Sequence, residues 1–136
     1  MVSSAFTARH ATEGVTVDVS ASVELLDQVR TARAFADTPV SMLLLAAKAV
    51  CLTLKRHESL HARWAETEIV YPAHVGLGIA AATDRGLLVP IVHAADTFTT
   101  PELAARINEL VATARSGRLQ PEQMRGGTFT ITNVGV

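Results

Sequence analysis

The chain has one cysteine and two lysines among its 136 residues, and it carries no large excess of charge of either sign. A lone Cys51 excludes a disulfide framework and a metal site built from cysteine thiolates. The net charge of −1, with scattered arginines, argues against a nucleic-acid partner or a polybasic membrane anchor. The longest apolar stretch, residues 42–54, is too short to span a bilayer, and residues 1–9 contain no apolar leader run. We therefore expect a soluble, cytoplasmic protein with no nucleic-acid or membrane partner.

Hydrophobic residues, by contrast, are abundant. They make up 49% of the chain against 18% charged residues, enough to build the core of one domain. Residues 12–19 alternate valines with polar residues, which predicts a half-buried strand. Ser20 is placed to cap a helix that runs to about residue 34.

Two more helices follow from periodicity and from end signals. Thr38 and Pro39 predict the start of the second helix, whose apolar stripe over residues 40–54 is the clearest helical pattern in the chain. Residues 100–102 start the third, and a Ser-Gly pair at residues 116–117 ends it.

The remaining segments have the character of strands. Residues 62–73 are short and β-like, with a turn predicted at residues 66–67. The apolar runs 75–82 and 87–93 are joined by a turn at residues 83–86, and their continuous apolar character predicts a sheet covered on both faces. Together with a terminal strand, this order predicts an α/β fold, a two-layer sandwich of helices on a mixed sheet.

The ten residues that precede the final Val136 carry the most specific signal. Residues 126–135 read Gly-Gly-Thr-Phe-Thr-Ile-Thr-Asn-Val-Gly, a strand leaving a tight turn with Thr128, Thr130 and Thr132 on one face. This segment resembles the Gly-Gly-Thr-Phe-Thr-Ile-Ser-Asn-x-Gly signature of the acyltransferase core subunit of 2-oxo acid dehydrogenase complexes.

Further motifs match that family in order and spacing. Residues 17–20, Val-Asp-Val-Ser, are similar to its V-D-V-T strand end. Residues 78–80 and 83–90 are similar to its G-I-A and T-x-x-G-L-x-V-P hairpin. The resemblance extends from about residue 10 to residue 136. It implies the fold of chloramphenicol acetyltransferase, and it makes residues 1–136 the N-terminal portion of the catalytic domain, without a lipoyl or peripheral-subunit-binding domain.

The resemblance also implies a reaction. The family moves an acyl group between the thiol of a dihydrolipoyl arm and the thiol of coenzyme A, both of which are substrates carried by the complex. A histidine in a His-Arg-x-x-x-Asp-Gly motif removes the thiol proton, and a serine hydroxyl stabilises the tetrahedral oxyanion. In the family the serine and the histidine come from neighbouring subunits of a trimer or larger core, which works with dehydrogenase and dihydrolipoamide dehydrogenase subunits.

Three residues of this chain match functional positions of the family. Thr132 occupies the position of the family's serine that stabilises the oxyanion. It keeps a hydroxyl group and adds a methyl group that restricts the side-chain rotamer. Asn133 matches an asparagine that contacts coenzyme A, and Ser41 matches a serine near the coenzyme. Each has a structural alternative: Thr132 as a β-favouring strand residue, Asn133 as a strand-end residue bonded to its own backbone, and Ser41 as a first-turn residue that competes for helix amides.

The chain departs from the family in several ways. Ala82 replaces an aspartate and Leu26 an arginine that the family often carries, which weakens the expected coenzyme contacts. The five histidines all lie outside a His-Arg-x-x-x-Asp-Gly context. His57 and His61 have a helical metal-binding spacing, but no third ligand is evident, so we expect no metal.

Other reaction classes find less support. The sequence has no G-x-S-x-G nucleophile elbow, and the glycines at residues 76 and 78 lack the third glycine and the helix of a dinucleotide site. Without the catalytic histidine, residues 1–136 are expected to be inactive alone. The alternative is a non-catalytic assembly or coenzyme-binding module on the same fold, or an unrelated α/β binding domain.

Overall fold

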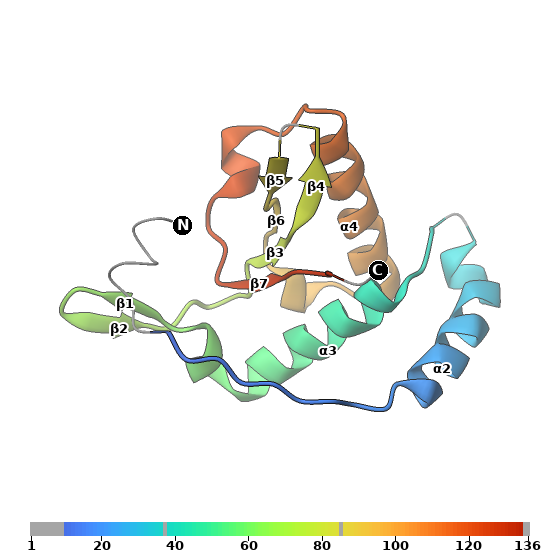
Figure 1. Cartoon of the computed structure of the whole chain (residues 1–136), viewed down its shortest axis with the longest axis horizontal. Coiled ribbons are helices and arrows are strands. Elements are labelled where there is room, and N and C mark those ends of the chain that lie inside the picture. Colours follow the sequence, from blue (N-terminus) through green and yellow to red (C-terminus); the bar gives the residue numbers. More distant parts are fainter. Residues whose placement is uncertain (1–9, 37, 85, 135–136) are drawn as a thin grey trace.

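A computed structural model describes residues 10–36, 38–84 and 86–134 of the chain. Three α-helices and seven short strands lie within these residues (Figure 1). The helices are α2 (Ser20–Thr31), α3 (Met42–Arg56) and α4 (Thr100–Arg115). The strands are β1 (Arg63–Ala65), β2 (Glu68–Val70), β3 (Leu77–Ile79), β4 (Ala81–Thr83), β5 (Gly86–Leu88), β6 (Ile91–Val92) and β7 (Phe129–Ile131). Single 3₁₀ turns are η1 (Arg33–Phe35), η2 (Glu58–His61), η3 (Ala95–Thr97) and η4 (Pro121–Met124).

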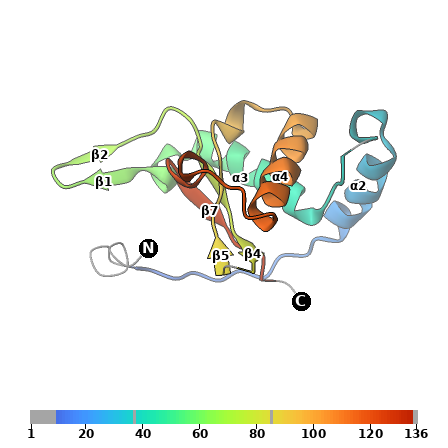
Figure 2. The same ribbon diagram turned by 90° about the horizontal axis from the view of Figure 1, so that it is seen from above.

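The central sheet is mixed, with strand order β6-β3-β7. Strand β3 pairs antiparallel with β6 and parallel with β7, which brings the end of the described chain beside its middle. Two hairpins, β1–β2 and β4–β5, form separate two-stranded sheets. Helices α3 and α4 pack on the central sheet, and α2 packs on α3 at the end away from the β1–β2 hairpin (Figures 1 and 2). This arrangement confirms the predicted α/β fold class.

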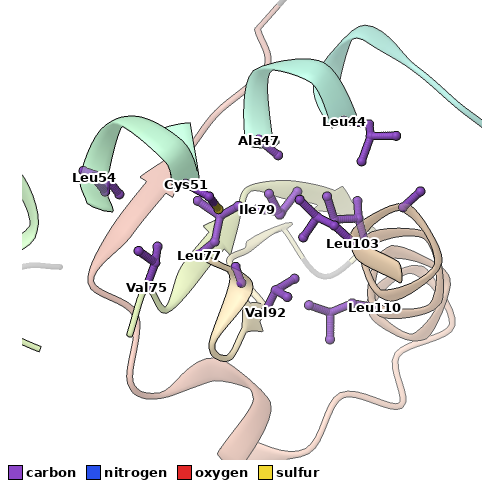
Figure 3. Packing of buried hydrophobic residues seen from close by; sticks show 13 residues of the cluster. Leu44, Ala47, Cys51, Leu54, Val75, Leu77, Ile79, Val92, Leu103 and Leu110 are labelled. Carbon is purple, nitrogen blue, oxygen red and sulfur yellow. The ribbon is translucent and has the colours of Figure 1, made fainter. Parts of the chain in front are cut away.

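The hydrophobic core lies between the central sheet and helices α3 and α4 (Figure 3). It contains the apolar stripe predicted for the second helix, because every third or fourth residue of α3 faces the sheet. Strand β3 is buried at all three positions, as expected for a strand covered on both faces. The buried cluster consists of Leu44, Ala47, Cys51, Leu54, Val75, Leu77, Ile79, Val92, Ala95, Leu103, Ala104, Ile107 and Leu110.

The start of α4 shows why the sequence signals for that helix were reliable. Thr99 is the N-cap, and both its backbone amide and its hydroxyl donate to the carboxylate of Glu102, at 2.8 and 2.6 Å. This capping box, followed by Pro101 in the first turn, satisfies amides that would otherwise lack partners. These hydrogen bonds lower the pKa of Glu102, so the carboxylate that holds the cap is charged at neutral pH.

The starts of the first two helices were predicted at the wrong residues. Helix α2 has Val19 at its N-cap position, and the Asp18 carboxylate rather than Ser20 accepts the first amide, from Ser20 at 2.8 Å. Helix α3 begins at Met42 with Ser41 as N-cap, not at Thr38 and Pro39. A proline fixes only its own φ, which also suits an extended segment, so Pro39 gave no firm helix start.

The strand predicted for residues 12–19 is also wrong. All of these residues are exposed and none belongs to a strand, although the segment runs extended past α3 (Figure 1). Alternation of valines predicts a strand only where a partner strand lies alongside, and the described part of this chain supplies none. The valines at positions 15 and 17 are 86% and 64% exposed.

The turn at residues 83–86 forms as predicted, apart from Arg85, which lies outside the described residues. The two apolar runs are each divided, into β3 and β4 and into β5 and β6. The prediction that both faces are covered holds for β3 and β6 but not for the β4–β5 hairpin, where Leu87 is 58% exposed. An apolar run therefore did not distinguish the central sheet from the hairpin that projects from it.

Replacing Gly76 by alanine is expected to lower the free energy of unfolding by about 1–3 kcal/mol, the usual cost of overpacking. A Cβ at Gly76 would overlap the carbonyl oxygen of Gly126 and lie 3.3 Å from the Cα of Gly127, and neither backbone atom can rotate away. Urea denaturation measures the loss. Gly14→Ala is the control, since a Cβ there meets nothing within 4 Å. Equal stability of both variants would contradict the close approach.

Candidate active site

The segment that carries Thr132 is held by the loop before β3. Gly126, at φ +80°, turns the chain into the terminal strand, a conformation that glycine adopts without strain. The amides of Thr128 and Phe129 donate to the carbonyl of Gly76 at 2.8 and 3.2 Å, and the Gly76 amide donates to the Thr128 hydroxyl at 3.1 Å. The two glycines of the terminal motif therefore allow the close approach that starts the strand.

Strand β7 pairs with β3 through backbone hydrogen bonds along its whole length. Phe129, Thr130 and Ile131 stand opposite Leu77, Gly78 and Ile79 in parallel register. The ladder ends where the Ala80 amide donates to the carbonyl of Ile131 at 3.0 Å, immediately before Thr132. The backbone on the N-terminal side of Thr132 is thus fixed by the sheet.

The threonine hydroxyls have different surroundings. The Thr128 hydroxyl is bonded to Gly76, and the Thr130 hydroxyl lies over Gly78, where an added Cβ would come within 2.8 Å of it. Thr132 follows β7 directly and is exposed. Asn133 is exposed beside it, and Gly135 of the terminal motif lies outside the described residues. A hydroxyl on a held backbone at the end of a ladder, open to solvent, is free to meet a substrate.

Ser41 lies at the other predicted coenzyme position. It is the exposed N-cap of α3, with extended φ and ψ of −136° and 167°, and its side chain makes no capping hydrogen bond. The structural alternative, a hydroxyl that competes for first-turn amides, is therefore not observed. Ser41 lies at the start of α3 and Thr132 and Asn133 lie directly after β7, so the candidate positions come from two different elements.

The groups considered for other chemistry are dispersed. Within the described residues, no three His, Cys, Asp or Glu side chains are grouped as metal ligands would be. His61 is buried and its Nδ1 has no hydrogen-bond partner, whereas His57 is the exposed C-cap of α3. Burial raises the pKa of the Cys51 thiol, followed by the charge of Asp96, so this cysteine is protonated and shielded rather than nucleophilic.

One pocket was not anticipated from the sequence. A cavity of about 290 Å³ lies between β6, α4 and η4. Arg106 borders it with its guanidinium 3.4 Å from Glu109 and 5.8 Å from the centre of the Phe98 ring. Its lining is scattered over the sequence, so no motif pointed to it: Ile91, Val92, His93, Phe98, Arg106, Glu109, Leu110, Thr113 and Gln123.

Comparison with known proteins decides the family. The profile of the 2-oxoacid dehydrogenases acyltransferase (catalytic domain) family matches residues 1–136. The chain belongs to this family. A similar curated protein is the dihydrolipoyllysine-residue acetyltransferase component of the pyruvate dehydrogenase complex of Staphylococcus aureus, 38% identical over 137 residues. That match covers 99% of this chain and 32% of the relative, so the chain spans about a third of the length of its curated relatives.

Solved structures of this family share the fold. The dihydrolipoamide acetyltransferase of Azotobacter vinelandii superposes with a TM-score of 0.81 at 28% identity, covering 87% of this chain and 49% of that one. In that enzyme a serine, a histidine and an asparagine have been studied for their role in the catalytic mechanism. The cubic core of the pyruvate dehydrogenase multienzyme complex superposes with a TM-score of 0.76 at 30% identity, covering 83% and 48% of the two chains.

Low pH is expected to weaken the hydrogen bond between Asp96 and the loop before β3. The Asp96 carboxylate accepts the Val75 amide at 2.8 Å and lies 3.4 Å from His74 Nδ1. Burial raises the pKa of Asp96, but these two hydrogen bonds outweigh burial and leave the pKa below its ordinary value. A carboxyl group whose pKa is lower in the folded state than in the unfolded state stabilises the fold at pH values above its unfolded-state pKa. This stabilisation is lost as the pH falls through the folded-state pKa.

Asp96→Asn should therefore be less stable than wild type at neutral pH, and the difference should shrink below about pH 4. Urea denaturation at a series of pH values measures it, with Asp84→Asn at the exposed β4–β5 turn as the control. A stability difference that stays constant from neutral to acid pH would show that the charge of Asp96 is not what stabilises this loop.

Proposed function

We propose that residues 1–136 form the N-terminal portion of an acyltransferase catalytic domain, which transfers an acyl group between a dihydrolipoyl thiol and coenzyme A. The observation that carries the proposal is the terminal strand: a family signature motif whose hydroxyl-bearing end is fixed on β3 and exposed. Family membership over the whole chain supports the same reaction. Coenzyme A and the lipoyl group are substrates carried by the complex, and the proposed site needs no metal.

The proposed chemistry divides between this segment and another. Attack of a thiolate on a thioester gives a tetrahedral oxyanion, which a preorganised donor stabilises most effectively. We assign the donor to the Thr132 hydroxyl, because β7 holds its backbone before the reaction begins. The base that deprotonates the attacking thiol is assigned to a histidine in a His-Arg-x-x-x-Asp-Gly motif, which these 136 residues do not contain.

Asn133 and Ser41 are proposed to contact coenzyme A. Both are exposed, and the Ser41 hydroxyl caps no amide of its own helix, so it can donate to a ligand. The alanine at position 82 and the leucine at position 26 remain places where this chain offers fewer polar contacts than its family.

The proposed setting is a multienzyme complex in the cytoplasm. Solved relatives with this fold are cores of such complexes, one of them cubic, which supports a homotrimer or larger core for this chain. Dehydrogenase and dihydrolipoamide dehydrogenase subunits are the proposed partners, with no nucleic acid and no membrane. Among the described residues, no helix combines the length and apolarity needed to cross a bilayer.

A non-catalytic assembly or coenzyme-binding module on the same fold is the second candidate. The absence of the histidine motif from these 136 residues is the observation that favours it. The two candidates differ in one property: an acyltransferase segment gains turnover when a catalytic histidine is supplied, whereas an assembly module does not.

The test joins residues 1–136 to a segment that carries the His-Arg-x-x-x-Asp-Gly motif and completes the catalytic domain, hereafter the joined enzyme. Transfer from acetyl-, succinyl- and branched-chain acyl-coenzyme A to dihydrolipoamide is followed by chromatographic separation of free coenzyme A from its acyl thioester. We expect turnover with one of these donors, and the preferred donor identifies the acyl group. Replacing the motif histidine by alanine is the control. A folded joined enzyme without turnover on any donor would favour the non-catalytic module.

A further inference from the structure

A buried carboxylate lies beside the loop that starts the site strand and has no role in the proposed chemistry. The side chain of Asp96, in the 3₁₀ turn η3, is only 5% exposed. Its Oδ1 accepts the amide of Val75 at 2.8 Å, and its Oδ2 lies 3.4 Å from Nδ1 of His74. Val75 is 1% exposed, so Asp96 supplies a partner for the amide of a buried residue. Without the carboxylate this amide would lose that partner.

The turn that carries the carboxylate is fixed from several sides. Lys48 of α3 donates through Nζ to the carbonyl of Phe98 at 2.7 Å, directly after the turn. The amide of Ala95 donates to the carbonyl of Val75 at 2.9 Å. Ala94, before the turn, has a left-handed backbone with φ of +50°, which persists in a residue other than glycine only where the surroundings impose it. The carboxylate is therefore presented from a turn that is held in place.

The loop that this carboxylate holds is the one on which the site strand starts. Gly76 follows Val75 directly, and its carbonyl accepts the amides of Thr128 and Phe129 at 2.8 and 3.2 Å. These bonds come before the paired residues of β7, so they set where the parallel ladder begins. A shift of one residue in a ladder turns every side chain to the other face. The position of residue 76 therefore helps to fix where β7 presents the Thr132 hydroxyl.

We propose that Asp96 is a positioning residue for acyl transfer, acting on Thr132 through residues 75 and 76 and strand β7. It touches no reacting atom. This role rests on the proposed function and on the assignment of the Thr132 hydroxyl as oxyanion donor. Such a donor is effective only when it is in place before charge develops, which requires its support to hold it within about 0.5 Å. Every contact on the path joins two residues of the described chain.

A double-substitution cycle in the joined enzyme separates positioning from a general loss of stability. We expect Asp96→Ala to lower kcat about 10–10²-fold, as expected for a displaced catalytic group, with KM changed much less. In the Thr132→Val background the same substitution should lower kcat no further, because no donor hydroxyl remains to be misplaced. All assays are run at a temperature at which circular dichroism shows every variant to be folded.

Two further variants provide a control and a graded response. Thr97→Ala removes the hydrogen bond from the Thr97 hydroxyl to the carbonyl of Ala94, 2.7 Å long and within the same turn, and should keep the kcat of wild type. Asp96→Asn keeps an oxygen that can accept the Val75 amide, but a neutral acceptor is weaker than a carboxylate. Its kcat should lie between those of wild type and Asp96→Ala. If Asp96→Ala does not fold, Asp96→Asn takes its place in the cycle.

The other outcomes overturn distinguishable claims. Wild-type kcat in the folded Asp96 variant of the cycle would reject the positioning role, and so would an equal loss of kcat in both backgrounds. A loss of the same size in Thr97→Ala would assign the effect to the whole turn and not to the carboxylate. These three results leave the proposed function standing. An unaffected Thr132→Val enzyme would instead reject the donor assignment, and a folded joined enzyme without turnover would reject the proposed function, each together with the positioning role.

Discussion

Thr132→Val in the joined enzyme is expected to lower turnover about 10²–10³-fold, the usual effect of removing a single oxyanion donor. Valine keeps the β-branched shape and the strand preference of threonine, so the change removes the hydroxyl alone. Because the donor acts on charge that develops in the transition state, KM should change much less than kcat. Steady-state kinetics with acyl-coenzyme A and dihydrolipoamide measure both constants.

Two neighbouring substitutions make this test specific. Thr132→Ser restores the hydroxyl that the family signature has at this position and should keep most of the turnover. Thr130→Val removes a hydroxyl from the same strand, over Gly78, and should have little effect on turnover. If Thr132→Val is within a factor of about three of wild type, against the loss expected for an oxyanion donor, Thr132 is only a strand residue.

The second large effect concerns residues 1–136 without a histidine segment. This polypeptide should show no measurable acyl transfer between dihydrolipoamide and coenzyme A, because loss of a positioned general base costs about 10²–10⁴-fold. The assay is the one used for the joined enzyme, on a preparation whose mass is verified by mass spectrometry. Turnover comparable to that of the joined enzyme would mean that a histidine of this segment serves as the base.

In that case the candidate bases would be the histidines of the described residues. His61 is buried with an unpartnered Nδ1, and His93 borders the pocket between β6, α4 and η4. Single His61→Gln and His93→Gln variants would then identify the base. We expect neither to matter, because His93 follows β6 on the opposite edge of the central sheet from β7, and His61 is buried in η2.

The elements predicted well are those whose signals are local. The α4 helix carries its own capping box, and the hairpin turn at residues 66–67 needs only a residue that tolerates a left-handed backbone, which Glu66 adopts at φ +56°. The apolar stripe of α3 was visible because a helix repeats its buried face every three or four residues. No partner elsewhere in the chain was needed to recognise any of them.

The elements predicted badly are those that depend on a partner. Residues 12–19 have the alternation of a strand, yet a strand exists only where another one lies beside it. The parallel pairing of β7 with β3 joins residues 52 positions apart, a contact that no local pattern specifies. The pairing of Trp64 with Ile69 across the β1–β2 hairpin was equally hidden, because it depends on the register of the two strands.

The candidate site follows the same division. The type and order of residues at 126–133 pointed to Thr132 and Asn133 through family resemblance, and the structure adds the ladder that holds their backbone. That Ser41 caps no amide could not be predicted, since an N-cap serine usually does so. The pocket beside Arg106 was missed because its lining comes from three elements separated along the chain.

We propose that this segment supplies the oxyanion donor and that, as in the family it resembles, a neighbouring subunit supplies the base. Mixing two inactive enzymes tests this central proposal most directly. Thr132→Val and the motif-histidine-to-alanine variants of the joined enzyme are unfolded together in equal amounts, reassembled and assayed. The account predicts recovery of about a quarter of wild-type turnover, because donor and base are each intact in half of the subunits that form a shared cyclic interface. A mixture no more active than its two components would contradict the shared site.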